Sequence, residues 1–132
     1  MSQQTIIVPG TPIAQARPRF FRRGKYVGTY NPQETEAGKF LLLAKSQIRE
    51  KIPPKTPITM DCRFYMPIPQ SWSKKKQAAA GGHTSPPDVS NLVKFIEDVL
   101  NGIAWDDDRQ IGMIMAVKLY SKEPRTEIVL SW

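Results

Sequence analysis

Apolar residues occupy every second position in one long segment of this chain, which predicts a strand with one buried face. From Ile58 to Met66, apolar side chains alternate with polar or charged ones, and this two-residue period is that of a half-buried strand. The run Thr5 to Val8 predicts a shorter strand, because a Pro-Gly turn follows it. Segments 111–120 and 126–132 predict two more strands, which we expect to form a closing hairpin through Lys122-Glu123-Pro124.

Two other segments repeat their apolar residues at helical spacing. The first begins at Asn31-Pro32-Gln33-Glu34, which combines a cap residue with a proline at the first helical position, and its pattern continues until Pro53. The second begins with Asp88 as the cap residue and ends at Asn101-Gly102, a good C-terminal stop. Its predicted buried stripe consists of Leu92, Phe95, Ile96, Val99 and Ile103.

Two connections between these elements have an unusual composition. Residues 17–30 combine basic and aromatic residues without any acid, so we expect an exposed basic loop or hairpin. Residues 67–87 contain a lysine triplet, an alanine triplet and several glycines and prolines, which predicts a flexible connection with one short helical turn. Residues 1–132 are therefore expected to form a single α/β (α+β) domain. In it a mixed sheet packs against two main helices, in the order β-α-β-α-β-β.

The composition adds a strongly basic character to this picture. Lys and Arg outnumber Asp and Glu by 19 to 12, which gives a net charge of +7. Such a charge is typical of nucleic-acid binding, although it also fits a merely soluble surface. The apolar runs are too short to span a bilayer, and the N-terminus lacks a leader pattern. The single Cys62 favours a buried reduced thiol, and we expect a soluble protein that stays inside the cell.

The acidic residues, by contrast, are concentrated in one part of the chain. Six of the 12 acidic residues lie between Asp88 and Asp108. Crowded carboxylates repel one another and are costly to ionise unless a cation lies between them, so the cluster favours a hard metal ion such as Mg²⁺. An acidic centre on a basic protein suits phosphodiester cleavage, because the cation activates water while Lys and Arg hold the phosphate backbone.

The second predicted helix would carry this chemistry on its outer face. Its polar residues recur every three or four positions, opposite the buried stripe: Asn91, Lys94, Asp98 and Asn101. In an extended segment after the helix, Asp106 and Asp108 would project to one side and Asp107 to the other. Each feature also has a plainer interpretation, namely a helix cap at Asp88, an ion pair on the helix surface and a solvated turn at the aspartate triplet.

Several aromatic residues and the single histidine leave alternatives open. Trp72 and Trp105 fit either core anchors, which are favoured, or platforms on which bases stack. His83 lies in a polar loop, where a solvated or hydrogen-bonding side chain is favoured over a metal ligand or general base. Phe20-Phe21 lies within the basic segment, where a place in the core and a wedge between base pairs are equally compatible with the sequence.

An ordered set of positions between residues 86 and 111 matches a known family pattern. The matching positions are Pro87-Asp88-Val89-Ser90-Asn91-Leu92-Val93-Lys94, Asp98, Leu100-Asn101-Gly102, Trp105 and Asp107-Asp108-Arg109-Gln110-Ile111. Pro9-Gly10 and Arg17-Pro18-Arg19 also look like the amino-terminal part of that family. On these residues, the chain resembles the RusA-type Holliday-junction resolvases, which are common in phages and prophages. The resemblance implies a homodimeric endonuclease of the bacterial cytoplasm and nucleoid that requires Mg²⁺, with Mn²⁺ as the alternative, and nicks two strands of a four-way DNA junction symmetrically in recombination and repair.

Carried over by position, the resemblance assigns roles to individual residues. Asp88 and Asp108 correspond to catalytic metal-binding acids, Asp107 and Asp98 support them, and Lys94 corresponds to the catalytic lysine. The basic residues predicted to contact DNA phosphates are Arg17, Arg19, Arg22, Arg23, Lys25, Lys74, Lys75 and Lys76.

One position departs from the family pattern. Ser90 stands where an aspartate is usual, and its hydroxyl cannot supply the charge of a carboxylate. Two other functions therefore stay open: a catalytically impaired protein that binds junctions, and a metal-dependent nuclease that acts on other branched nucleic acids.

Overall fold

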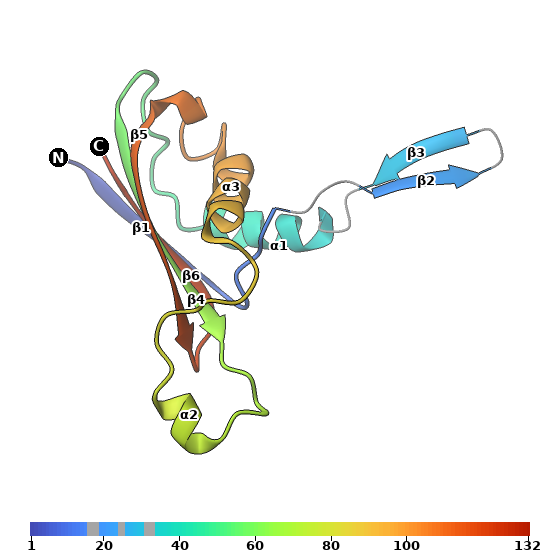
Figure 1. The fold of residues 1–132 in the computed structure, drawn as a ribbon. Coiled ribbons are helices and arrows are strands. Elements are labelled where there is room, and N and C mark those ends of the chain that lie inside the picture. Colours follow the sequence, from blue (N-terminus) through green and yellow to red (C-terminus); the bar gives the residue numbers. More distant parts are fainter. Residues whose placement is uncertain (16–18, 24–25, 31–33) are drawn as a thin grey trace.

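A mixed four-stranded sheet forms the centre of the protein (Figure 1). The structure is a computed structural model that describes residues 1–15, 19–23, 26–30 and 34–132. The strands of the sheet are β1 (Gln3–Pro9), β4 (Ile58–Pro67), β5 (Ile111–Ser121) and β6 (Arg125–Ser131). They lie in the order β1-β6-β4-β5, in which β4 is parallel to β5 and antiparallel to β6.

The predicted closing hairpin of the last two strands is wrong. β5 and β6 follow one another in sequence, but β4 lies between them and pairs with both. The short connection through Lys122-Glu123-Pro124 therefore crosses over one strand instead of closing a hairpin. β4 pairs with β5 from Ile58 to Pro67 and with β6 from Thr59 to Tyr65, so both of its edges are occupied and it keeps β5 and β6 apart. β5 becomes an edge strand of the sheet.

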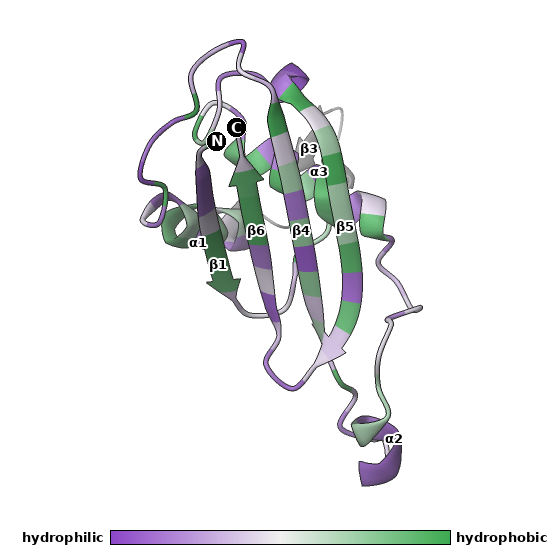
Figure 2. Ribbon diagram, turned by 90° about the vertical axis from the view of Figure 1, so that its left-hand side faces the viewer, coloured by the Kyte–Doolittle hydropathy of each residue, from purple (hydrophilic) through white to green (hydrophobic). Residues whose placement is uncertain are grey.

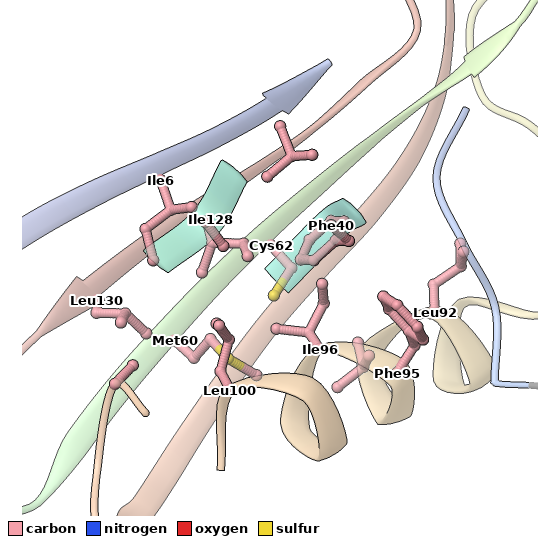
Figure 3. Close-up of a cluster of buried hydrophobic side chains, with 14 of the residues drawn as sticks. Ile6, Phe40, Met60, Cys62, Leu92, Phe95, Ile96, Leu100, Ile128 and Leu130 are labelled. Atoms are coloured by element: carbon pink, nitrogen blue, oxygen red, sulfur yellow. The ribbon is translucent and has the colours of Figure 1, made fainter. Parts of the chain in front are cut away.

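Two helices cover one face of the sheet and leave the other face open (Figures 1 and 2). They are α1 (Glu34–Lys45), which contacts β1, and α3 (Val89–Leu100), which contacts β5. The core lies between these helices and the sheet (Figure 3), and its largest fully buried side chains include Ile6, Phe64, Leu92, Ile96, Trp105 and Leu130. This arrangement confirms the predicted mixed sheet packed with two main helices.

The first helix is shorter than the sequence predicts. α1 ends at Lys45, whereas the apolar pattern suggested a helix up to Pro53. The residues that follow α1 bond to β1 instead of extending the helix. The Gln47 side chain accepts a hydrogen bond from Ile7 N (2.8 Å) and donates one to Ile7 O (2.7 Å). Ile52 is fully buried outside any helix, and its N–H donates to Ala104 O (2.9 Å). The predicted helix start at 31–33 lies outside the described residues.

The sequence predicts a loop or a hairpin for the basic segment 17–30, and the described residues of this segment form a hairpin. β2 (Arg19–Arg23) pairs antiparallel with β3 (Tyr26–Tyr30), and this hairpin projects away from the sheet (Figure 1). The connection 67–87 contains the expected helical turn as α2 (Lys74–Ala78), whose first turn is capped by the Ser73 hydroxyl.

Two further sequence predictions about the core, for Cys62 and Trp105, are confirmed. Cys62 is buried on β4, and burial raises the pKa of its thiol to about 12, with the charges of Asp61 and Glu97 acting in the same direction. Trp105 is fully buried, as expected for a core anchor. Within the described ranges, no helix has the length and apolar character needed to cross a membrane.

Candidate active site

Helix α3 separates a buried side from an exposed side, as its sequence predicts. Of the predicted stripe, Leu92, Phe95 and Ile96 are buried, while Val99 and Ile103 are half-buried. The prediction missed two buried residues of the helix, Val93 and Leu100. The residues predicted for the outer side, Asn91, Lys94, Asp98 and Asn101, are all exposed. The helix ends where expected, because Asn101 is its C-cap and Gly102 has a positive φ of 79°.

Asp88 stands at the N-cap of α3 but does not cap the helix with its side chain. Its backbone has the extended conformation of a cap residue, yet its carboxylate makes no capping hydrogen bond. The plainer interpretation of Asp88 as a capping side chain is therefore wrong. Its carboxylate is exposed at the positive end of the helix dipole, where a negative charge is favoured.

Lys118 of β5 fixes the chain just before Asp88. Its Nζ donates to the carbonyl oxygens of Ser85 (2.8 Å) and Pro87 (2.7 Å). Two charge-assisted hydrogen bonds from a strand to the segment that enters α3 hold Asp88 in place relative to the sheet. No local sequence pattern indicates this role, because Lys118 lies more than 30 residues from its partners.

The acidic turn after α3 is held by one buried glutamine. Gln110, in the short helix η1 (Asp108–Gln110), accepts hydrogen bonds from the N–H groups of Asp106 and Asp107, both at 3.0 Å. Its amide donates to Pro53 O (2.9 Å) and Thr56 O (3.1 Å). A side chain that is 9% exposed and fully engaged in this way ties the turn to the segment before β4.

The three consecutive aspartates have three different environments. Asp106 forms an ion pair with Lys51 at 3.8 Å, on the surface. Asp107 binds Arg109, and this hydrogen bond lowers the pKa of the Asp107 carboxyl. The Oδ1 of Asp108 accepts the indole N–H of Trp105 at 2.7 Å. The predicted alternation along an extended segment is wrong here, because Asp108 begins the helix η1.

Glu97 is a carboxylate near this turn that sequence reasoning did not single out. Burial and the charge of Asp108 raise its pKa, Lys94 opposes the rise, and Asp98 adds to it. The structure therefore brings Glu97 into the electrostatic neighbourhood of three predicted site residues. Its spacing of three residues after Lys94 places it on the adjacent part of the helix surface, which is the signal that was available.

The donor set is compatible with Mg²⁺, although it is not a ready-made cage. Within the part of the chain that is described, no group of three or more His, Cys, Asp or Glu side chains is arranged to hold a metal ion. Mg²⁺ does not need one, because it usually binds through one or two carboxylates, waters and the phosphates of a substrate. The exposed carboxylate of Asp88 and the remaining oxygen of Asp108 are hard donors of the required kind.

The predicted DNA-contacting residues fall in two places. Arg19, Arg22 and Arg23 lie on β2, while Arg17 and Lys25 lie outside the described residues. The lysines 74–76 are exposed on α2.

Trp72 beside α2 is half-buried, so it is not a core anchor. Its ring lies 4.2 Å from the Nζ of Lys76 and 5.0 Å from the ring of Tyr120. The side chains of Phe20 and Phe21, on β2, are not among those described.

His83 is half-buried, with its ring packed against the end of the sheet. Its ring lies 4.7 Å from the ring of Tyr120, and its buried Nδ1 has no hydrogen-bond partner among the described residues. Burial, followed by the charge of Lys118, lowers the pKa of His83. The predicted solvated or hydrogen-bonding state is therefore wrong for this nitrogen.

Comparison with known proteins agrees with this geometry. The family model described as "Endodeoxyribonuclease RusA" matches residues 9–131. The chain belongs to the RusA family of endodeoxyribonucleases. A protein of Bacillus subtilis (strain 168), "Uncharacterized protein YqaN", is 38% identical over 130 residues, which cover 93% of this chain and 92% of that protein.

Membership in the RusA family makes this protein a DNA endonuclease, a hydrolase of phosphodiester bonds. The family resolves Holliday junctions and acts on branched DNA, and its members generally depend on a divalent metal ion. The resemblance noted on residues 86–111 is thus confirmed over nearly the whole chain.

Proposed function

We propose that this RusA-family endonuclease uses Mg²⁺ to resolve four-way DNA junctions by paired symmetric nicks, as a homodimer, in recombination and repair. The observation that supports this most is the state of Asp88, whose carboxylate is exposed at the start of α3 and is not used for capping. Lys94 lies on the same helix, about 9 Å further along its axis. A carboxylate and an ammonium group are therefore both exposed on the same helix of a basic protein.

The proposed reaction is an in-line attack of water on a phosphodiester, which leaves a 5′-phosphate and a 3′-hydroxyl. When bound, Mg²⁺ would supply a Lewis acid for the attacking water and the leaving oxygen. Asp88 and Asp108 would hold the ion. Lys94 would position the water or offset the negative charge that develops on the phosphate.

Asp98 and Asp107 have indirect roles in this proposal. Asp98 lies four residues after Lys94 on α3, so these two side chains are neighbours on the helix surface. Asp107 has both carboxylate oxygens engaged by Arg109. These two acids would orient waters or neighbouring side chains.

The test is a nicking assay on a synthetic four-way junction and on linear duplex of the same sequence, with Mg²⁺ and with chelator. Asp88→Asn should lower cleavage by about 10³-fold, while junction binding is kept or tightened because a charge that repels DNA is lost. The matched control is Asp61→Asn, an acid on the open face of the sheet beside Arg63. Equal loss of binding and cleavage in Asp88→Asn would make Asp88 a structural residue.

The proposed phosphate contacts have their own test. Removing the lysines of α2 or the arginines of β2 should weaken junction binding and reduce its dependence on salt, because each phosphate contact releases counterions. An unchanged salt dependence in both sets of variants would show that DNA binds elsewhere.

Ser90 supports a second candidate, a protein that binds junctions but cleaves them weakly. Ser90 is exposed in the first turn of α3, where the family pattern has a carboxylate. Ser90→Asp should therefore lower the Mg²⁺ concentration needed for half-maximal cleavage by about tenfold, and Ser90→Ala should leave it unchanged. If wild type binds the junction tightly but cleaves only after Ser90→Asp, the impaired binder is the correct function.

A further inference from the structure

The two edges of the central sheet are treated differently by the rest of the chain. The edge at β1 is closed by side chains that follow α1. Gln47 bonds both backbone groups of Ile7, and Arg49 Nη2 donates to Gln3 O at 2.8 Å. Unpaired backbone groups at a sheet edge can pair with a strand of another chain. At β1, these side chains already bond several of those groups.

The edge at β5 is closed at one end. His83 N donates to Lys118 O (3.2 Å), and Tyr120 N donates to Gly81 O (2.8 Å). Since backbone groups alternate along a strand, those of Ile114 and Ala116 point toward the same outer edge. No described residue bonds to them there. The earlier half of β5 is therefore an unpaired edge.

The side chains along this half of β5 are apolar and exposed on both faces of the strand. We call residues 113–117 the β5 strip. Met113, Met115 and Val117 are 57%, 48% and 39% exposed and share the open face, whereas Ile114 is 43% exposed on the helix-covered face. The hydropathy along β5 is visible in Figure 2. The segment 111–117 contains no charged residue, in a chain of net charge +7.

We propose that the β5 strip is the surface through which two copies of this chain associate, around a two-fold axis close to Met115. DNA does not fit as the occupant, because the strip offers no cation to a phosphate. A second copy does fit, because a strip without charge is where two basic chains can meet with least repulsion. Met113, Met115 and Val117 are all apolar and exposed on the open face, so an axis close to Met115 places each of them opposite an apolar residue of the second copy.

Antiparallel pairing of β5 with its copy would join the two sheets into one. A two-fold axis perpendicular to the joined sheet keeps the helix-covered faces on the same side. The two α3 helices, each with its acidic centre, would then face one DNA junction together. This inference names the dimer surface and rests on the proposed function only for the claim that the dimer is the working form.

The first test is the mass of the free protein in solution, measured by light scattering without DNA or metal. We expect wild type at twice the 15.0 kDa chain mass and Met115→Glu at the single chain mass. The matched control is Ile7→Glu, which changes an equally exposed apolar residue of the same face at the other edge, and should remain dimeric. A monomeric wild type, or a dimeric Met115→Glu with an unchanged circular dichroism spectrum, would overturn the proposal.

The second test locates the axis. Met115→Cys should form a disulfide-linked dimer on mild oxidation, because directly opposed residues around such an axis lie within the Cα distance of a disulfide. Met113→Cys should link much less, since it would face Val117 of the partner subunit. Cys62 does not interfere, because it is buried. A dimer that links equally well at 113 and 115 would overturn the axis at Met115.

These outcomes are separate from those of the cleavage assay. A monomer that nicks junctions in pairs would overturn the β5 interface and leave the proposed function standing. A β5-linked dimer that neither binds nor cleaves junctions would do the reverse.

Discussion

The segment from Asp88 to Gln110 has two sides that differ in burial and in charge. Its inner side is buried, and includes Phe95, Trp105 and Gln110, which pack or hydrogen-bond to other parts of the fold. Its outer side is exposed and charged, with Asp88 and Lys94. The difference shows that one side of a segment can stabilise the fold while the other side presents charged groups for chemistry. Variants on the two sides should therefore separate unfolding free energy from cleavage rate.

The largest effect is expected on the inner side. Phe95 is 4% exposed, and its ring meets that of Phe40 edge to face at 5.3 Å. Phe95→Ala should lower the unfolding free energy by about 3–5 kcal/mol, because it removes buried surface and leaves a cavity. Urea unfolding measures this loss, and Phe95→Leu, which fills most of the space, should lose much less. Equal losses in the two variants would mean that the loss comes from the missing ring contact and not from the cavity.

On the outer side, Lys94→Gln should act on cleavage alone. Loss of its charge should slow junction cleavage by about 10²–10³-fold, as for other groups that stabilise a developing charge, while urea unfolding stays within about 0.5 kcal/mol of wild type. The matched control is Lys39→Gln, an exposed lysine on α1. If both variants cleave like wild type, Lys94 has no role in the reaction.

Gln110 connects the two sides, so its variant should lower both the unfolding free energy and the cleavage rate. Gln110→Leu leaves two N–H groups of the acidic turn and two carbonyls without their partner, which should cost about 1–3 kcal/mol of unfolding free energy. Cleavage should fall as well, because the turn that carries Asp108 is released. The exposed Gln70→Leu is the control. Full stability with lost cleavage would place Gln110 on the outer side of the comparison.

The sequence was sufficient for elements whose pattern is local. The alternation of 58–66 and the helical spacing after Asp88 predicted β4 and α3 with boundaries close to those observed. The arrangement of β5 was not predictable in the same way. A short connection favours a hairpin, and only the pairing of β4 with both of its neighbours excludes it.

In the candidate site, too, residues in a local pattern could be predicted from the sequence, and residues that act through distant partners could not. Asp88 and Lys94 were identified from a short ordered motif, which is local information. Gln110 and Lys118 act through partners that lie 57 and 33 residues away, and no local pattern records such contacts. The importance of Glu97 likewise depends on Asp108, which only the fold brings near it.

Glu97 lies at the boundary between the two sides, and it should give the smallest effect. Burial and Asp108 raise its pKa above the ordinary value of 4.5, so the folded protein binds this proton more tightly than the unfolded chain. The unfolding free energy should therefore fall as pH rises from about 4.5 through the raised pKa.

Glu97→Gln removes this pH-dependent loss of stability, because an amide does not ionise. In chelator, the variant should be more stable than wild type at about pH 7 and should lose less stability between about pH 4 and pH 7. Urea unfolding at the two pH values measures this, with the exposed Glu36→Gln on α1 as control. Lys94 offsets part of the repulsion, which keeps the gain small. A variant less stable than wild type at neutral pH would mean that the Glu97 charge is held by a favourable contact and belongs wholly to the inner side.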